Sequence, residues 1–125
     1  MANPAPGFAK RPGHRVDIAP CDAHVRVTLG NQLVAESRAP LRLAESTLPV
    51  VWYLPLADVN QDLLQRSDTS TYCPFKGHAS YWSLKVAEKQ VPDALWAYED
   101  PYDECAELVG YVAFYSTTVS IAVDD

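Results

Sequence analysis

The chain of 125 residues is long enough for one compact domain and too short for two ordinary ones. Its net charge of −6, with only ten Lys and Arg residues, argues against a nucleic-acid binder, which needs a basic face. No apolar run approaches the roughly 18–20 residues of a membrane helix, and residues 1–15 lack the apolar block of a secretory signal, so we expect a cytoplasmic protein without a membrane partner.

The first twenty residues differ in composition from the rest. Residues 1–20 are rich in Pro, Gly and basic side chains, which predicts an extended arm. This arm lies across the body, reaches a second subunit or is partly disordered. Residues 21–125 are expected to form a single β-rich domain. Its first element is a hairpin over 23–37, in which alternating apolar residues flank the turn Gly30-Asn31.

Two more strands follow, over 41–46 and within 48–55. The second lies between two prolines and is dense in β-branched and aromatic residues, so we expect it to be well buried. After Pro55 the period becomes helical. Apolar residues at i, i+3, i+7 and i+8 from Leu56 predict one short helix, which a polar loop over 67–71 ends.

The stretch TYCPFKGHASYW, residues 71–82, predicts a turn from Pro74 to Gly77 that enters a strand. A turn over 88–93 and a strand over 94–98 follow. Capping residues then predict a short helix over 99–110, and the last segment, 111–123, predicts a hairpin. Together these elements predict a mainly β fold, either a curved antiparallel sheet or a two-sheet domain, with one or two short helices.

Four motifs occur in order along the chain: VVWYLPLADV, TYCPFKGHASYWSL, ALWAYEDP and LVGYVAFY. Together they resemble the domain of unknown function 427 family over residues 23–123. The resemblance implies a β-tent-like fold, in which antiparallel sheets lean together and enclose a pocket, and it implies no established activity. Relatives of that fold carry zinc on two CxxC pairs. Because the three cysteines here form no such pair, we expect no metal, no cofactor and no disulfide framework.

One broad classification groups the family with nucleotidyltransferases. That chemistry places a Gly-Gly or Gly-Ser turn before carboxylates that hold Mg²⁺. The chain has no such turn, and its carboxylate run over 99–107 falls on the predicted short helix. The residues therefore argue against this activity.

Aromatic side chains on the predicted strand faces indicate a concave pocket with a few polar groups, which is the usual anatomy of a small-molecule site. Lys76, at the tip of a tight turn, would hold an anionic or polar end of the ligand, with Cys73 beside it. It would otherwise pair with a carboxylate such as Glu45 or Asp58, or remain solvated. The predicted ligand-binding residues are Glu45, Tyr53, Lys76, Tyr81, Trp96 and Tyr98.

Two alternatives remain open. An enzyme would use the same pocket, with Cys73 as nucleophile or His78 as general base and Lys76 stabilising negative charge. No Ser-His-Asp ordering is visible in the sequence. A structural module would form a homo-oligomer through the N-terminal arm or exposed β-edges, and the aromatic residues would then be only core.

Overall fold

Strands dominate the computed structural model, which describes residues 2–124. Within that range ten strands form two antiparallel sheets. Across the larger sheet the strands run in the order β1 (Val16–Pro20), β4 (Leu41–Glu45), β5 (Val51–Pro55), β9 (Tyr111–Phe114), β8 (Lys89–Ala97), β7 (Gly77–Val86) and β6 (Leu64–Cys73). The smaller sheet has the order β10 (Ser120–Asp124), β2 (His24–Leu29) and β3 (Gln32–Ser37). The predicted mainly β fold with two antiparallel sheets is confirmed.

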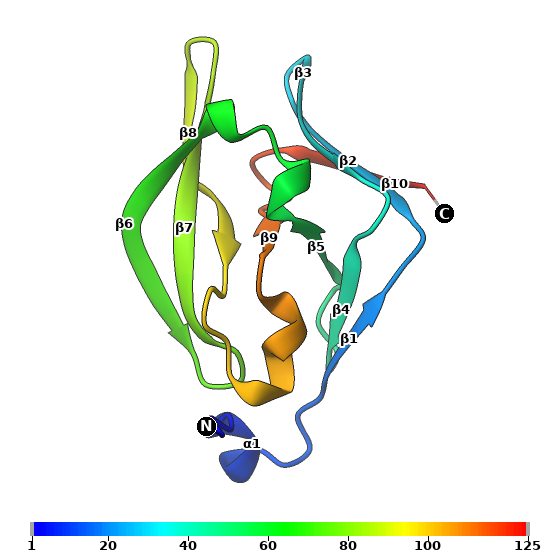
Figure 1. Ribbon diagram of the computed structural model, residues 1–125, viewed down its shortest axis with the longest axis vertical. Helices are drawn as coiled ribbons and strands as arrows, with labels where there is room; N and C mark the ends of the chain where they lie inside the picture. The colour runs from blue at the N-terminus through cyan, green and yellow to red at the C-terminus, as the bar shows by residue number, and fades with distance from the viewer. Residues whose placement is uncertain (1, 125) are drawn as a thin grey trace.

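Helical segments are short. They are α1 (Gly7–Lys10) and three 3-10 segments, η1 (Leu56–Asp58), η2 (Gln61–Leu63) and η3 (Asp103–Leu108). In Figure 1, β6 and β7 lie on the left and β1 and β4 on the right, with residues 103–108 in front between the two sides. In the described part of the chain, no helix is long and apolar enough to cross a membrane.

The side chains of β7 alternate between two apolar clusters, as its period of two predicts. Trp82, Leu84 and Val86 face a mainly aliphatic cluster that also takes in Val25, Val27 and Leu95 of other strands. Ala79 and Tyr81 face the second cluster, which we call the tyrosine cluster. Its buried members are Leu41, Leu43, Tyr53, Ala79, Tyr81, Tyr98, Cys105, Leu108 and Ala113, and Cys73, Trp96 and Tyr111 are among the half-buried residues packed against them.

Several local predictions are confirmed. The first hairpin is formed by β2 and β3, with Gly30 at φ +60 in the two-residue turn. The strands predicted over 41–46 and within 48–55 appear as β4 and β5, which pair with each other. The turn over residues 74–77 leads into β7, with Gly77 at φ +122.

The helix predicted after Pro55 is wrong. Residues 56–58 and 61–63 form separate 3-10 turns, and β6 begins at Leu64. Val59 breaks the helix because it is buried in extended conformation and forms a bridge with Ala35 of β3. The predicted polar loop over 67–71 lies inside β6. Its polar side chains fit a strand because β6 is the exposed edge of the sheet.

The predictions for the second half need three further corrections. β8 starts at Lys89, so the turn over 88–93 is shorter than expected, and Ala87 takes the positive φ of that turn. The predicted helix over 99–110 is reduced to the 3-10 segment η3. The predicted C-terminal hairpin is wrong, because β9 pairs with β5 and β8 whereas β10 pairs with β2 in the other sheet.

The N-terminal segment lies against the body of the domain. β1 pairs with β4, with Val16 opposite Glu45, so the chain joins the sheet at residue 16 and not at residue 21. Ahead of β1, the Asn3 and Ala5 N–H groups donate to the carboxylates of Asp103 and Glu104. Among the alternatives for residues 1–20, the described ones therefore lie across the body.

A substitution at Gly77 tests whether the turn that enters β7 requires a glycine. Its φ of +122 disfavours a side chain, and an added Cβ would lie 3.4 Å from the Asp100 carbonyl oxygen. We expect Gly77→Ala to lower the free energy of unfolding by about 1–3 kcal/mol, measured by urea denaturation. Gly13→Ala is the control, because its Cβ meets nothing within 4 Å, and it should change the free energy by less than about 0.5 kcal/mol. Equal effects of the two variants would contradict this account.

Candidate functional site

A tight turn directs the Lys76 side chain inward. The Lys76 N–H donates to the Cys73 carbonyl over 3.2 Å and closes the turn. The turn is held on one side by the Tyr102 N–H, which donates to the Lys76 carbonyl, and on the other by the Gly7 N–H, which donates to the Pro74 carbonyl. Because segments before and after it both bind its backbone, the turn gives Lys76 a restricted position.

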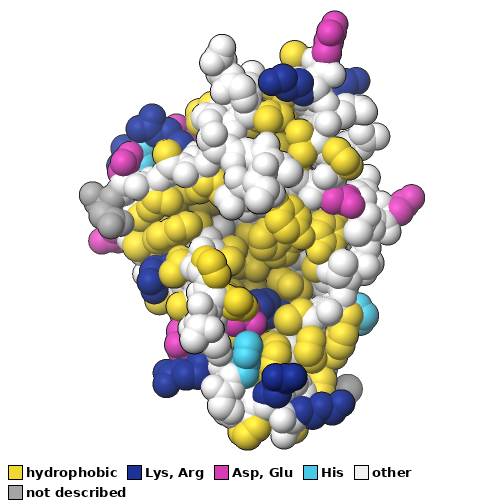
Figure 2. Space-filling model, turned by 180° about the vertical axis from the view of Figure 1, so that it is seen from behind, with side chains coloured by type: hydrophobic (Ala, Val, Ile, Leu, Met, Phe, Trp, Pro, Cys, Tyr) yellow, Lys and Arg dark blue, Asp and Glu magenta, His cyan; other side chains and the backbone are white. Residues whose placement is uncertain are grey.

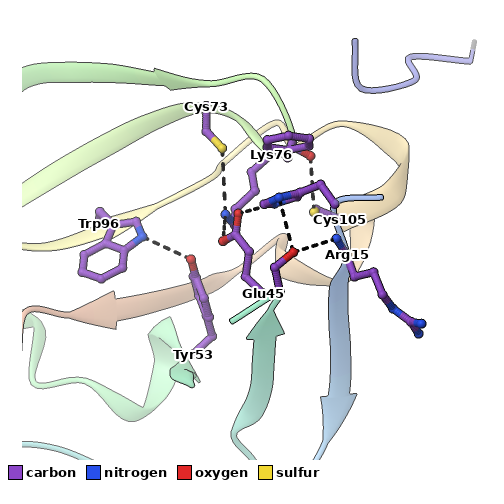
Figure 3. A network of polar contacts seen from close by, with 10 residues as sticks. Arg15, Glu45, Tyr53, Cys73, Lys76, Trp96 and Cys105 are labelled. Carbon is purple, nitrogen blue, oxygen red and sulfur yellow. Dashed lines mark hydrogen bonds and ion pairs between the residues drawn. The ribbon is translucent and has the colours of Figure 1, made fainter. Parts of the chain in front are cut away.

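The Lys76 ammonium group is buried against Glu45. Its Nζ lies 2.5 Å from Oε1 of Glu45 and 3.8 Å from Sγ of Cys73, and Figure 3 shows Lys76 between these two residues. The side chains of Lys76 and Glu45 are 8% and 14% exposed. Of the two carboxylates considered from the sequence, Glu45 is therefore the partner. At this degree of burial each charge depends on the other, because neither is well solvated by water.

Glu45 has a second partner, His14. The Nε2 atom of His14 lies 2.8 Å from Oε2 of Glu45, and the His14 ring stacks on Phe75 with centroids 3.8 Å apart. Burial opposes ionisation of Glu45, but the hydrogen bonds and charges of Lys76, and then of His14, outweigh it and hold the pKa of Glu45 below its ordinary value. Glu45 is therefore an ionised acceptor for both neighbours.

No pattern in the sequence indicates a role for His14. It lies in the segment expected to be an extended arm, and 31 residues separate it from Glu45. The register of β1 against β4 brings the two together, because Val16 is opposite Glu45 and the residues just before β1 therefore lie beside the end of β4. A local sequence pattern cannot predict a contact between residues so far apart in the chain.

The four predicted aromatic residues gather in one place. Tyr53, Tyr81 and Tyr98 are buried in the tyrosine cluster, and Trp96 packs against them. The Trp96 indole N–H donates to the Tyr53 hydroxyl over 3.1 Å. Burial raises the pKa of Tyr53 and of Tyr98 above the ordinary value, so both remain neutral phenols at physiological pH. Figure 3 shows the Trp96–Tyr53 pair beside the Lys76–Glu45 pair.

A cavity of about 500 Å³ adjoins this cluster. Trp96 and Tyr115 form part of its wall, with ring centroids 4.5 Å apart. Figure 2 shows the hollowed face with its mainly hydrophobic lining, and a basic, an acidic and a histidine side chain lie together at its lower end. Trp96 lines the cavity, whereas the three predicted tyrosines are buried in the cluster next to it. The other lining residues are Leu48, Pro49, Val50, Val51, Trp52, Phe114, Ser116, Ile121 and Val123.

The remaining predicted residues lie at different distances from this group. Cys73 is half-buried and is part of it, through its contact with Lys76. His78 is exposed, and its ring packs against Tyr72 on the adjacent strand, so the structure does not bring it to Lys76. Cys105, which is not among the predicted site residues, is fully buried, and burial raises the pKa of its thiol to about 11. Within residues 2–124 no three His, Cys, Asp or Glu side chains are grouped as a metal site.

Removing one charge of the buried pair tests its role in stability. Lys76→Met leaves Glu45 without its main partner, and we expect the free energy of unfolding to fall by about 3–5 kcal/mol. The double variant Lys76→Met/Glu45→Gln should recover most of this loss, because no unpaired charge remains buried. Denaturant unfolding measures both, with exposed Lys85→Met as the control. A double variant as unstable as Lys76→Met would show that the charge pair is not the cause.

The depressed pKa of Glu45 predicts a pH dependence of stability. Since the pKa is lower in the folded chain than its ordinary value of 4.5, ionised Glu45 stabilises the fold above that pH. This contribution is lost as the pH falls through the folded pKa. We expect the free energy of unfolding to decline less steeply below about pH 5 in Glu45→Gln than in the wild type. Urea denaturation at a series of pH values measures this dependence. An equally steep decline in the free energy of unfolding for Glu45→Gln and the wild type would contradict this expectation.

Comparison with known proteins places the chain in a family. Its sequence matches the family described as a domain of unknown function (DUF427) over residues 17–125. The matched region includes Glu45, Lys76 and the tyrosine cluster, and it begins after His14. Comparison with curated proteins finds no match. Since the match covers most of the 125 residues, this chain belongs to the DUF427 family of domains of unknown function.

Proposed function

We propose that this domain binds a small molecule with a polar or anionic group, in the cavity walled by Trp96 and Tyr115. The observation that carries the proposal is an apolar, aromatic-walled cavity. The buried Lys76–Glu45 pair is not part of its lining. Glu45 is joined to the cavity wall by one turn, in which the Leu48 N–H donates to the Glu45 carbonyl over 2.8 Å. A volume of about 500 Å³ lies within the range of small-molecule sites.

The energetics of the ion pair support a binding role. A buried pair of charges seldom stabilises a fold more than hydrophobic residues of the same volume would, because both charges lose their hydration. A lysine ammonium has three N–H donors. Two of those on Lys76 are directed at Glu45 and Cys73, so the polar end of a ligand that extends from the cavity to this pair would accept from the third.

The local charge also restricts the ligand. Lys76 is balanced by Glu45, so the pair provides a hydrogen-bond donor and an acceptor but no net positive charge. A triphosphate needs several cations or a metal ion to offset its charge. The apolar lining instead favours a molecule with a ring or short aliphatic body and a single polar or anionic end.

A ligand screen with variants of the cavity wall tests the proposal. The wild type is screened by thermal shift against a library of small carboxylates, amides and ring compounds. We expect Trp96→Leu and Leu48→Glu each to weaken binding of any hit about tenfold or more. Trp96→Leu removes an aromatic ring from the cavity wall, and Leu48→Glu places a negative charge on that wall. Leu48 and Leu33 are both exposed, but Leu33 lies on β3 of the smaller sheet. Leu33→Glu is therefore the matched control.

Tryptophan fluorescence titration gives the affinities. A hit that binds Trp96→Leu, Leu48→Glu and the wild type equally well occupies another site and contradicts the proposal. Loss of binding in Leu33→Glu as well as in Leu48→Glu would point to a general effect of added charge and would also count against it.

A further inference from the structure

Ser46, His14 and Glu45 form a continuous series of polar contacts at the end of β4. Ser46 Oγ lies 3.4 Å from Nδ1 of His14, and Nε2 of His14 lies 2.8 Å from Glu45. A hydroxyl, an imidazole and a carboxylate in this order are the parts of a nucleophile–base–acid triad, which is recognised by geometry and not by sequence position. The sequence does not show it, because the pairing of β1 with β4 brings His14 to the other two residues.

The direction of each hydrogen bond follows from the charge of Glu45. An ionised carboxylate only accepts, so Nε2 of His14 must carry the proton that it shares with Glu45. In a neutral imidazole Nδ1 is then the acceptor, and it faces the Ser46 hydroxyl. Lys76 holds Glu45 in the ionised form from the other side. The ring of His14 therefore presents a basic nitrogen to Ser46.

Ser46 itself is strained and held in place. Its φ of +45 is in the left-handed region, which a residue other than glycine rarely adopts. Its hydroxyl oxygen accepts from the Arg15 N–H over 3.0 Å, and its own N–H donates to the Arg15 carbonyl over 2.8 Å. Ser46 is exposed, whereas the side chains of His14 and Glu45 are 18% and 14% exposed. Strain of this kind is often kept where a reacting group must be positioned.

We propose that Ser46 is the nucleophile of an ester hydrolysis, with His14 as general base and with Glu45 and Lys76 as positioning residues. Ser46 Oγ bonds to the ester carbonyl carbon while its proton moves to Nδ1 of His14. The bond from that carbon to the alcohol oxygen then breaks, and His14 returns the proton to the departing alkoxide. Water attacks the acyl-serine by the same route, which releases the carboxylic acid and restores Ser46.

The proposal rests on the proposed function in one respect, because the same cavity would hold the apolar part of the ester. Ser46 and Leu48 belong to one turn, and Leu48 lines the cavity. The Ser46 N–H is engaged by the Arg15 carbonyl and cannot stabilise the oxyanion of the tetrahedral intermediate. Turnover should therefore be slow, and covalent labelling of Ser46 is the more sensitive measurement.

The test uses a short-chain alkyl fluorophosphonate, which bonds to an activated serine with loss of fluoride. We expect one label per molecule by intact mass, located at Ser46 by peptide mapping and absent in Ser46→Ala. His14→Gln should slow labelling about a hundredfold or more, with folding checked by thermal denaturation. Ser70→Ala, which alters an exposed serine on β6, should label as the wild type does. Labelling that persists unchanged in Ser46→Ala would overturn the proposal.

Glu45→Gln separates a positioning role from a merely structural one. Lys76 only donates, so it takes the amide oxygen of Gln and turns the amide NH₂ toward His14. Nε2 must then accept, the ring proton moves to Nδ1, and the base that faces Ser46 is lost. We expect labelling to fall at least a hundredfold in a variant that remains folded. If Glu45→Gln is labelled as fast as the wild type, the roles assigned to Glu45 and His14 are wrong.

The catalytic inference and the binding proposal can fail separately. Leu48→Glu and Trp96→Leu should slow labelling by a long-chain fluorophosphonate more than by a short-chain one. Equal labelling by both chain lengths, still dependent on Ser46, would support the nucleophile and contradict the shared cavity. A ligand that binds the cavity of a wild-type chain in which Ser46 resists labelling would support binding and overturn the catalytic inference.

Discussion

A charged ammonium group is costly to hold away from water without an anion in contact, and this requirement organises the candidate site. Lys76 comes from a turn in the second half of the chain and Glu45 from the end of β4, so their pairing joins two distant segments. His14 and Phe75 complete the contact from the N-terminal segment and from the turn itself. The N-terminal segment thus contributes His14 to the candidate site.

The pleat of the strands creates the apolar surroundings of this charge pair. Successive side chains of β7 point to opposite faces of the sheet. The same strand therefore contributes residues to the aliphatic cluster and to the tyrosine cluster. The hydroxyl groups of Tyr53 and Tyr81 make polar contacts, with Trp96 and Thr71, while their rings fill space. Trp96 connects the cluster with the cavity, because its ring forms a wall and its N–H binds Tyr53.

One carboxylate serves two proposed roles. Through one oxygen Glu45 neutralises Lys76 beside the cavity, and through the other it orients His14 toward Ser46. In these two proposals, binding and chemistry would be coupled by a single residue whose ionisation both require.

Periodicity and turn chemistry in the sequence were sufficient for the mainly β fold, the Gly30 hairpin, the turn before Gly77 and the membership of Tyr53, Tyr81, Trp96 and Tyr98 in one aromatic region. The hairpin and the turn depend on neighbours within a few residues, and the place of each aromatic side chain on its strand face follows from the period of two. The sequence was not sufficient for the 3-10 turns after Pro55, for β10 joining β2, or for His14 and Ser46 meeting at Glu45. Those outcomes depend on strand register across long separations, which only the packed tertiary structure decides, because each contact becomes favourable only after the sheets have formed.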